Sequence, residues 1–200
     1  MSTIKSIELQ ALGGPDQYKL IEGPLPVPGP NEVRVRVEAT GIAYADVMMR
    51  HGAYPGTPAP PFVPGYDIVG FVEAVGREVS PSWMGKRISA LIQRGGYAEA
   101  AIVPAKNLVE VPSTLDAAQA QALNLNYVSA WQMLHRITKV KSGQRILVQG
   151  AAGGVGTALV QLARHHGVEV WGPASAGKHH LLTPYGVHAI DYKTEDVFKR

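Results

Sequence analysis

The stretch Gln149-Gly-Ala-Ala-Gly-Gly-Val-Gly156 (QGAAGGVG) decides how the second half of this chain folds. It follows the apolar residues 146–148 and precedes 157–163, where apolar side chains recur at helical spacing. Glycine is costly inside regular structure, so four glycines in eight residues indicate a backbone that closely approaches something else. Counted from Ala151, the stretch reads Ala-x-Gly-x-x-Gly, a dinucleotide-binding fingerprint with alanine at its first position.

The elements around this stretch alternate between strand and helix. We expect parallel strands over 145–149, 168–171 and 187–191, and a short helix over 178–185. Between the first two strands we expect a helix that Gly167 ends. Its apolar face is formed by Val155, Ala158, Leu159, Leu162 and Ala163. The order β-α-β-α-β predicts a doubly wound parallel sheet, the Rossmann architecture.

A glycine-rich turn between a strand and a helix suits a pyrophosphate. The residues that we expect to bind the cofactor here are Ala152, Gly153, Gly154, Val155 and Gly156. Gly153 lets the backbone approach the phosphates, Gly156 lets the helix pack closely on the strand, and the helix N-terminus offers N–H groups. The alternative is a turn that serves only to pack the helix on the sheet.

The end of the second strand indicates which dinucleotide binds. An NAD site places an acidic residue there to hold the ribose 2′-hydroxyl. Here 171–178 contains no acid, and Ser175 and Lys178 stand where a 2′-phosphate would bind, which favours NADP(H) over NAD(H). The alternative for Lys178 is an ordinary surface lysine.

The first half of the chain is rich in strands. Valine and arginine alternate over 33–37, as in a half-buried strand that follows a proline-rich loop over 23–30. Gly70 indicates a bulge or a close approach. Further strands are predicted over 68–75, 88–92 and 98–103, and helices over 113–123 (capped by Ser113 or Asp116) and 126–137. This pattern predicts an antiparallel barrel or sandwich.

Composition excludes several classes of function. The 200 residues carry a formal charge of +3 without any basic run, which argues against nucleic acid as a partner. The absence of cysteine excludes disulfides, thiolate nucleophiles and cysteine-ligated zinc. We find no secretory leader and no apolar run of the ~20 residues that a membrane span needs, so a cytoplasmic protein is expected.

Five motifs in order resemble the medium-chain dehydrogenase/reductase superfamily, in its zinc-independent quinone oxidoreductase branch. They are Gly41-Ile-Ala-Tyr-Ala-Asp46, Pro64-Gly-Tyr-Asp67, Gly95-Gly-Tyr-Ala-Glu99, Asn126-Tyr-Val-Ser-Ala130 and Ala151-Ala-Gly-Gly-Val-Gly156. The resemblance implies a GroES-like, partly open β-barrel catalytic domain over 1–125 and a Rossmann NADP-binding domain over 126–200, with the active site in the cleft between them. Family members continue past the third Rossmann strand, so we expect this chain to be a truncated piece of a homodimeric protein.

The resemblance also identifies where zinc-dependent members hold their metal. Those positions are occupied here by Ala43, Tyr66, Asp67 and Asn126, of which only Asp67 can coordinate, so we expect no metal site. The histidines at 165–166 and 179–180 are adjacent pairs, which point to different sides of a helix and make poor chelates.

Without zinc, the chemistry that fits is hydride transfer from NADPH to a quinone or an α,β-unsaturated carbonyl. Hydrogen-bond donors must then stabilise the developing negative charge on oxygen, and Tyr54, Tyr44 and Tyr66 are the candidates, Tyr54 first. Relatives usually have asparagine at Ala43, and Tyr192 matches a position on the adenosine phosphate side. We expect Asp46 to be a local hydrogen-bond acceptor. Two alternatives stay open: an enoyl-thioester reductase, and an NADPH-binding protein with little turnover.

Overall fold

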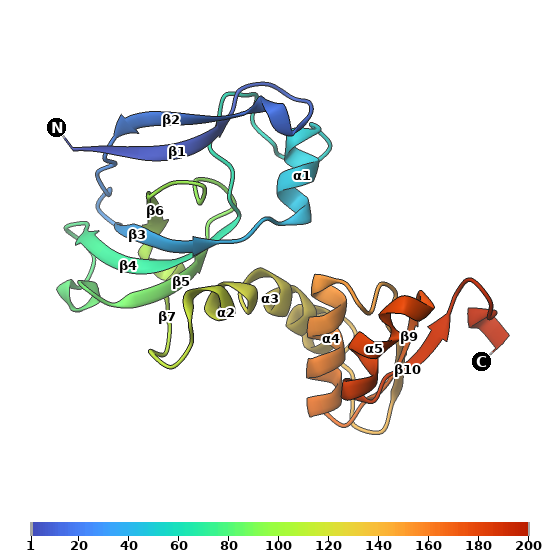
Figure 1. Cartoon of the computed structure of the whole chain (residues 1–200). Coiled ribbons are helices and arrows are strands. Elements are labelled where there is room, and N and C mark those ends of the chain that lie inside the picture. The colour runs from blue at the N-terminus through green and yellow to red at the C-terminus, as the bar shows by residue number, and fades with distance from the viewer. Residues whose placement is uncertain (1, 200) are drawn as a thin grey trace. The chain divides into compact units, whose positions relative to one another are not determined.

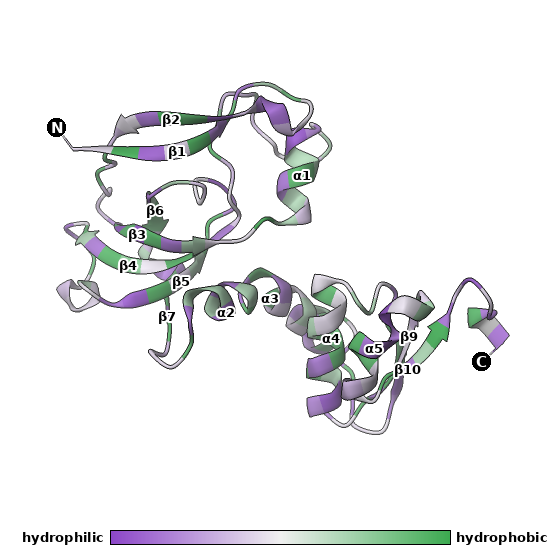
Figure 2. Cartoon of the chain, viewed as in Figure 1, coloured by the Kyte–Doolittle hydropathy of each residue, from purple (hydrophilic) through white to green (hydrophobic). Residues whose placement is uncertain are grey.

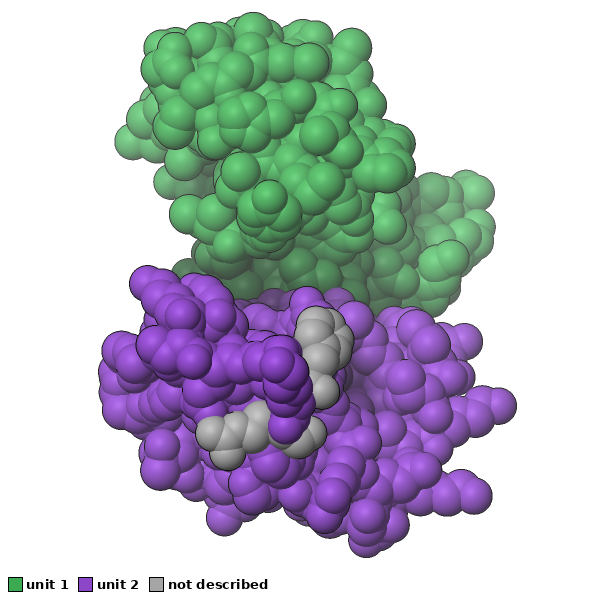
Figure 3. Space-filling view, turned by 90° about the vertical axis from the view of Figure 1, so that its right-hand side faces the viewer, with its two compact units in different colours: residues 1–125 green, residues 126–200 purple. Residues whose placement is uncertain are grey.

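The chain divides into two compact units, residues 1–125 and residues 126–200 (Figure 3). The structure is a computed structural model that describes residues 2–199, and Figure 1 shows the elements along the chain. Each unit has a sheet and a hydrophobic core of its own.

The first unit is built on a five-stranded antiparallel sheet in the order β6-β3-β4-β5-β7. Its strands are β3 (Glu32–Thr40), β4 (Asp67–Val75), β5 (Arg87–Leu91), β6 (Ala100–Pro104) and β7 (Val109–Glu110). Hydrophobic and hydrophilic residues alternate along β3 (Figure 2), where Val33 and Val35 are fully buried and Arg36 pairs with Glu73 of β4 at 3.3 Å. The predicted alternation over 33–37 is confirmed, and the strand extends beyond it at both ends.

A close backbone approach explains Gly70. A Cβ atom at this position in β4 would lie 2.0 Å from the Arg36 carbonyl oxygen of β3. The register between the two strands shifts between Val37 and Ala39, next to this contact. The approach expected from the sequence is therefore present.

A separate two-stranded hairpin and a short helix complete the first unit, and neither is predicted from the sequence. β1 (Thr3–Leu9) pairs with β2 (Tyr18–Pro24) through a loop that holds the 3-10 turn η1 (Pro15–Gln17). The proline-rich loop therefore begins only after Pro24. Helix α1 (Tyr44–Arg50) is tied to the hairpin because the Arg50 guanidinium donates to the Gly13 carbonyl oxygen at 2.7 Å.

Helices lead from the first unit into the second. α2 (Ala117–Ala122) is capped by Asp116, whose Oδ1 accepts from the Gln119 amide at 2.7 Å, so of the two expected caps the aspartate is correct. α3 (Leu125–Trp131) continues into the π-helical turn η4 (Gln132–Ile137), where the sequence predicted a uniform helix. Single 3-10 turns are η2 (Pro81–Trp83) and η3 (Ala105–Asn107) in the first unit, and η7 (Val197–Lys199) in the second.

The second unit holds a three-stranded parallel sheet in the order β10-β9-β8. Its elements are β8 (Arg145–Leu147), α4 (Gly154–His165), β9 (Glu169–Ala174) and β10 (His188–Asp191). The predicted β-α-β-α-β order is confirmed. The helix expected over 178–185 is instead three consecutive short elements, η5 (Ala176–Lys178), α5 (His179–Leu182) and η6 (Thr183–Tyr185). Helix α5 ends two residues before Pro184, which cannot continue it.

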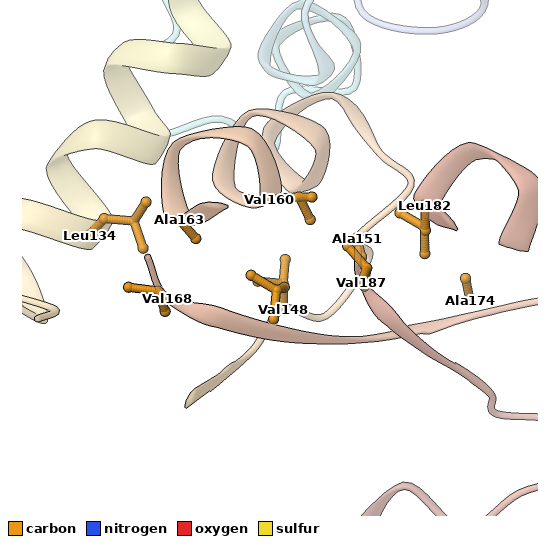
Figure 4. Packing of buried hydrophobic residues seen from close by; sticks show 10 residues of the cluster. Leu134, Val148, Ala151, Val160, Ala163, Val168, Ala174, Leu182 and Val187 are labelled. Carbon is orange, nitrogen blue, oxygen red and sulfur yellow. The ribbon is translucent and has the colours of Figure 1, made fainter. Parts of the chain in front are cut away.

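One face of this sheet packs against α4, as Figure 4 shows from close by. Val160 and Ala163 of α4 are fully buried and point toward Val148 and Val168 on the strand side. Val155 is only half-buried, so the apolar face differs from the predicted one by including Val160 in its place. Gly167 ends the helix with a left-handed φ of +68°, as expected.

Candidate cofactor and active site

The glycine-rich loop turns directly into the N-terminus of α4. Gly150 has a left-handed φ of +65°, and its carbonyl oxygen accepts the Gly153 amide at 2.8 Å, which closes the turn. Gly153 is the N-cap residue, and its carbonyl oxygen accepts the first helical bond from Thr157 at 2.8 Å. Gly153 and Gly154 are exposed, so the first N–H groups of the helix are presented where an anion can reach them.

Gly156 is where the helix touches the loop. A Cβ atom here would lie 2.1 Å from the Gly150 carbonyl oxygen and 2.8 Å from the Ala151 Cα atom, and both are backbone. At Gly153, by contrast, a Cβ atom would lie 3.2 Å from the same carbonyl oxygen. Gly156 therefore serves packing, and Gly153 keeps the exposed side of the turn clear.

Two residues that the sequence did not assign to the cofactor support the loop. The Asn126 amide group of α3 lies beside it, 2.9 Å from where a Gly154 Cβ atom would stand. Gly172 of β9 leaves room for the Ala151 methyl group, which would lie 2.7 Å from a Gly172 Cβ atom. The only sequence signal for either is an asparagine or a glycine in an otherwise ordinary element.

The other proposed cofactor residues lie at the same edge of the sheet. Asp191 of β10 pairs with Ala174 of β9, so Tyr192 and Ser175 follow the carboxyl ends of neighbouring parallel strands. Tyr192 is 55% exposed, and Lys178 is exposed at the end of η5. The loop after β8 ends at this edge too, which is where ligands bind in open α/β sheets.

In the first unit the structure brings two of the three candidate tyrosines together. The hydroxyl groups of Tyr54 and Tyr66 are 3.1 Å apart, and their rings meet edge to face with centroids 6.3 Å apart. Burial, followed by the hydrogen bond to Tyr54, raises the pKa of Tyr66 to about 12. Either hydroxyl group can be the donor in this pair, and when Tyr66 donates to the Tyr54 oxygen the Tyr54 proton is left for another acceptor.

Tyr44 stands apart from this pair. It is the first residue of α1 and is 78% exposed. Tyr54, by contrast, is held through its carbonyl oxygen, which accepts from the Thr57 hydroxyl at 2.6 Å. The geometry thus separates a fixed tyrosine pair from a third tyrosine on the surface.

Asp46 is a buried acceptor between two loops. It is 1% exposed, its Oδ2 accepts from the Ala43 amide at 2.8 Å, and its Oδ1 accepts from the Gly65 amide at 3.2 Å. Burial raises the pKa of its carboxyl group, and the two amide bonds oppose this by lowering the pKa. The expected role as a local hydrogen-bond acceptor is confirmed.

Asp67, the one potential metal ligand among the zinc-type positions, is also engaged. It is 1% exposed, its Oδ1 accepts from the Gln121 side chain at 3.1 Å, and its Oδ2 accepts from the Leu125 amide at 3.3 Å. Gly41 leaves the space that the Gln121 amide fills. Within residues 2–199, no group of three or more histidine, aspartate or glutamate side chains is arranged to hold a metal ion.

Two hollows in the surface of the first unit contain none of these tyrosines. One is lined in part by Lys86 and Arg87, which are paired with Glu110 and Glu38 at 2.7 Å each. The other lies along 27–30 and 74–77. The charges of the first hollow are already matched by protein groups, so we do not place the site there.

Comparison with known proteins agrees with this arrangement. Residues 29–113 match the alcohol dehydrogenase GroES-like domain. The chain is 40% identical over 197 residues to the synaptic vesicle membrane protein VAT-1 homolog of Rattus norvegicus, and 36% identical over 191 residues to a quinone oxidoreductase of Mus musculus. These alignments cover 96% and 94% of this chain, and 49% and 57% of the two relatives.

A solved structure is similar over both units. The quinone oxidoreductase of Thermus thermophilus, described with its NADPH complex, superposes with a TM-score of 0.81 at 38% identity, covering 92% of this chain and 58% of that one. The chain belongs to the medium-chain dehydrogenase/reductase superfamily. Within this superfamily it falls in the quinone oxidoreductase-like branch.

This superfamily member spans about half the length of the curated relatives it matches. Its first unit is the GroES-like domain, and its second unit carries the three-stranded parallel sheet of the Rossmann type. None of the helices described over residues 2–199 is both long and apolar enough to cross a membrane.

Proposed function

We propose that this medium-chain reductase binds NADPH at the carboxyl edge of its parallel sheet, and that the whole protein transfers hydride from NADPH to a quinone or an α,β-unsaturated carbonyl. The observation that carries the proposal is the exposed glycine turn at the start of α4, with Ser175 and Lys178 at the end of the next strand. Its relatives support the proposal, since one is a quinone oxidoreductase and another was solved with NADPH.

The residues present fit the cofactor. The turn of Gly153 and Gly154 would take the pyrophosphate on the free N–H groups of α4, while Gly156 holds the helix close to the loop. Lys178 and Ser175 would take the 2′-phosphate, and Tyr192 would flank the adenosine side. When bound, NADPH supplies the hydride, so the protein contributes orientation and electrostatics.

The tyrosine pair supplies a hydrogen-bond donor for the acceptor oxygen. The two hydroxyl groups are 3.1 Å apart and either can donate; in the proposed reaction Tyr66 donates to Tyr54, and the Tyr54 hydroxyl group donates to the carbonyl or quinone oxygen as negative charge develops on it. Tyr44 remains a third candidate donor. The reaction is proposed to be zinc-independent because Ala43 and Tyr66 replace ligands and both oxygens of Asp67 already accept protein hydrogen bonds.

A cytoplasmic homodimer completes the proposal, as expected from the sequence. The two alternatives, an enoyl-thioester reductase and an NADPH-binding protein with little turnover, enter as outcomes of the test.

The test is the oxidation of NADPH by the full-length protein with 9,10-phenanthrenequinone. We expect turnover with the quinone, and Tyr54→Phe should lower kcat by roughly a hundredfold to a thousandfold while leaving NADPH affinity unchanged, because it removes a single donor. Unchanged turnover in this variant removes Tyr54 from catalysis.

Two other results point to the alternatives. Turnover with crotonyl thioesters but not with quinones identifies an enoyl-thioester reductase. NADPH that binds and quenches tryptophan fluorescence without any turnover identifies a binding protein.

A further inference from the structure

We propose that Asp46 is a positioning residue for the tyrosine pair, acting on Tyr66 through the backbone amide of Gly65. This inference rests on the proposed function, because it assigns a role in the reaction that the Tyr54–Tyr66 pair serves. Asp46 itself is buried and is not assigned contact with substrate or cofactor.

Asp46 satisfies two backbone donors, and each donor needs its own acceptor oxygen. The amides of Ala43 and Gly65 both point at Asp46, and each is bonded to a different carboxyl oxygen. Ala43 precedes α1, and Gly65 directly precedes Tyr66, so one buried carboxyl group joins the start of the helix to the loop that carries Tyr66. An asparagine offers only one acceptor oxygen and cannot make both bonds.

The loop that carries Tyr66 has little other freedom. Gly65 has a φ of +103°, and a Cβ atom there would lie 2.5 Å from the Tyr97 amide nitrogen, so the loop passes directly against 96–97. The Tyr66 carbonyl oxygen accepts from the amides of Ile92 and Gln93 at 3.0 Å each. Asp46 holds the backbone on the other side of Tyr66, and together these bonds fix where the Tyr66 side chain leaves the chain.

The backbone at Gly65 and Tyr66 determines where the Tyr66 hydroxyl group lies. The Tyr66 hydroxyl lies 3.1 Å from that of Tyr54, so a shift of the Gly65–Tyr66 backbone moves the donor that orients Tyr54. A displacement of about 1 Å in a positioned catalytic group can cost up to a hundredfold in rate. Loss of the Gly65 bond should therefore act on turnover through Tyr66.

The experiment is a double-mutant cycle in the full-length protein, with Asp46→Asn, Tyr66→Phe and the double variant. Each single change should lower kcat with the quinone by roughly tenfold, and Asp46→Asn should add nothing in the Tyr66→Phe background, because both disturb one donor. The KM for NADPH should stay unchanged, since the proposed cofactor residues are in the other unit.

Asp67→Asn is the matched control. Asp67 is equally buried, and it also binds one side-chain or backbone N–H with each oxygen, but its partners are Gln121 and Leu125 rather than Gly65. Any effect of Asp67→Asn on kcat should be the same in the Tyr66→Phe background as in wild type. Additive effects of Asp46→Asn and Tyr66→Phe would overturn the proposal.

A second measurement follows the Gly65 bond directly. The shorter bond is the one to Ala43, so the asparagine should keep that bond and lose the one to Gly65. Hydrogen exchange of the Gly65 amide should then become faster in Asp46→Asn, and unchanged protection would overturn the proposed route. If the asparagine variant does not fold, Asp46→Ser, which adds no volume, takes its place in the cycle. Its effect on kcat should likewise be non-additive with that of Tyr66→Phe.

The cycle separates this proposal from the proposed function. If wild type turns over the quinone and Tyr66→Phe lowers kcat, an additive effect of Asp46→Asn on kcat excludes the positioning role of Asp46 and leaves the proposed function standing. If wild type has no turnover, the proposed function fails, and the role in it fails with it.

Discussion

Replacing Gly156 with alanine should unfold the second unit at a distinctly lower temperature. The new methyl carbon would lie 2.1 Å from the Gly150 carbonyl oxygen and 2.8 Å from the Ala151 Cα atom. Neither atom can rotate away as a side chain does, because both belong to the backbone of the turn. Helix α4 must therefore move away from the loop.

The size of the effect follows from two opposing contributions. Overpacking a close contact costs typically about 1–3 kcal/mol and occasionally more, and a backbone contact this short belongs at the upper end. Alanine recovers roughly 1 kcal/mol through its helix propensity. We therefore expect a net loss of about 2 kcal/mol, which in a protein of this size lowers Tm by roughly 4–8 °C.

Thermal unfolding followed by circular dichroism measures this loss, with two glycine variants as controls. Gly177→Ala places its methyl group in open space at an ordinary φ, so its Tm should equal or slightly exceed that of wild type. At Gly153, a methyl group meets one backbone oxygen at 3.2 Å, so Gly153→Ala should fold nearly as well as wild type but weaken NADPH binding. If Gly156→Ala melts with wild type, the packing role of Gly156 is refuted.

Two further predictions concern charge. Lys178→Ala should weaken NADPH binding roughly fivefold to tenfold and leave NADH binding nearly unaffected, since only NADPH carries the 2′-phosphate. Lys141, which is also exposed and precedes β8, is the control position. Equal losses of affinity for both cofactors in Lys178→Ala would exclude the 2′-phosphate role. Burial raises the folded-state pKa of Asp67, so its contribution to the free energy of unfolding is complete below the unfolded pKa of about 4 and is lost as pH rises through the folded pKa. The stability deficit of Asp67→Asn in urea should therefore be larger near pH 4 than at pH 7, and a deficit that grows with pH would contradict this sign.

The second unit could be predicted from the sequence in some detail because its signals are local. A strand, a glycine turn, an apolar helix and a second strand follow one another within 145–174, and two strands joined by such a helix pair in parallel. The helix expected over 178–185 was wrong in detail because α5 ends at Leu182, before Pro184, and a 3-10 turn follows it. The sequence placed Val155 on the buried face of α4, whereas Val160 is buried and Val155 is only half-buried. Which of the two valines is buried depends on what packs beside the helix.

The first unit was harder to predict, since its pairings join distant residues. β1 and β2 lack a clear alternation, and β1 makes an additional bridge from Ser6 to Ala98. Helix α1 has no side-chain acceptor at its N-cap position Ala43, and the bond at this end instead runs from the Ala43 amide to the Asp46 carboxyl group inside the helix.

The candidate site shows the same division. The glycine turn, Ser175 and Lys178 could be chosen from the sequence because strand ends place them at one edge. The contact of Tyr54 with Tyr66, and the bond of Asp46 to Gly65, are tertiary contacts that no sequence spacing encodes.

The contact between Trp171 and His188 provides an optical reporter of the parallel sheet. Their rings are stacked with centroids 4.5 Å apart at 20°, one on β9 and the other on β10. Glu169 accepts from the Trp171 indole at 3.0 Å and lies 3.2 Å from His188 Nε2. The Trp171 indole can stack on the His188 ring only while β9 and β10 remain paired, so its fluorescence should change once the strands separate. That change would reveal opening of this edge before the rest of the chain unfolds.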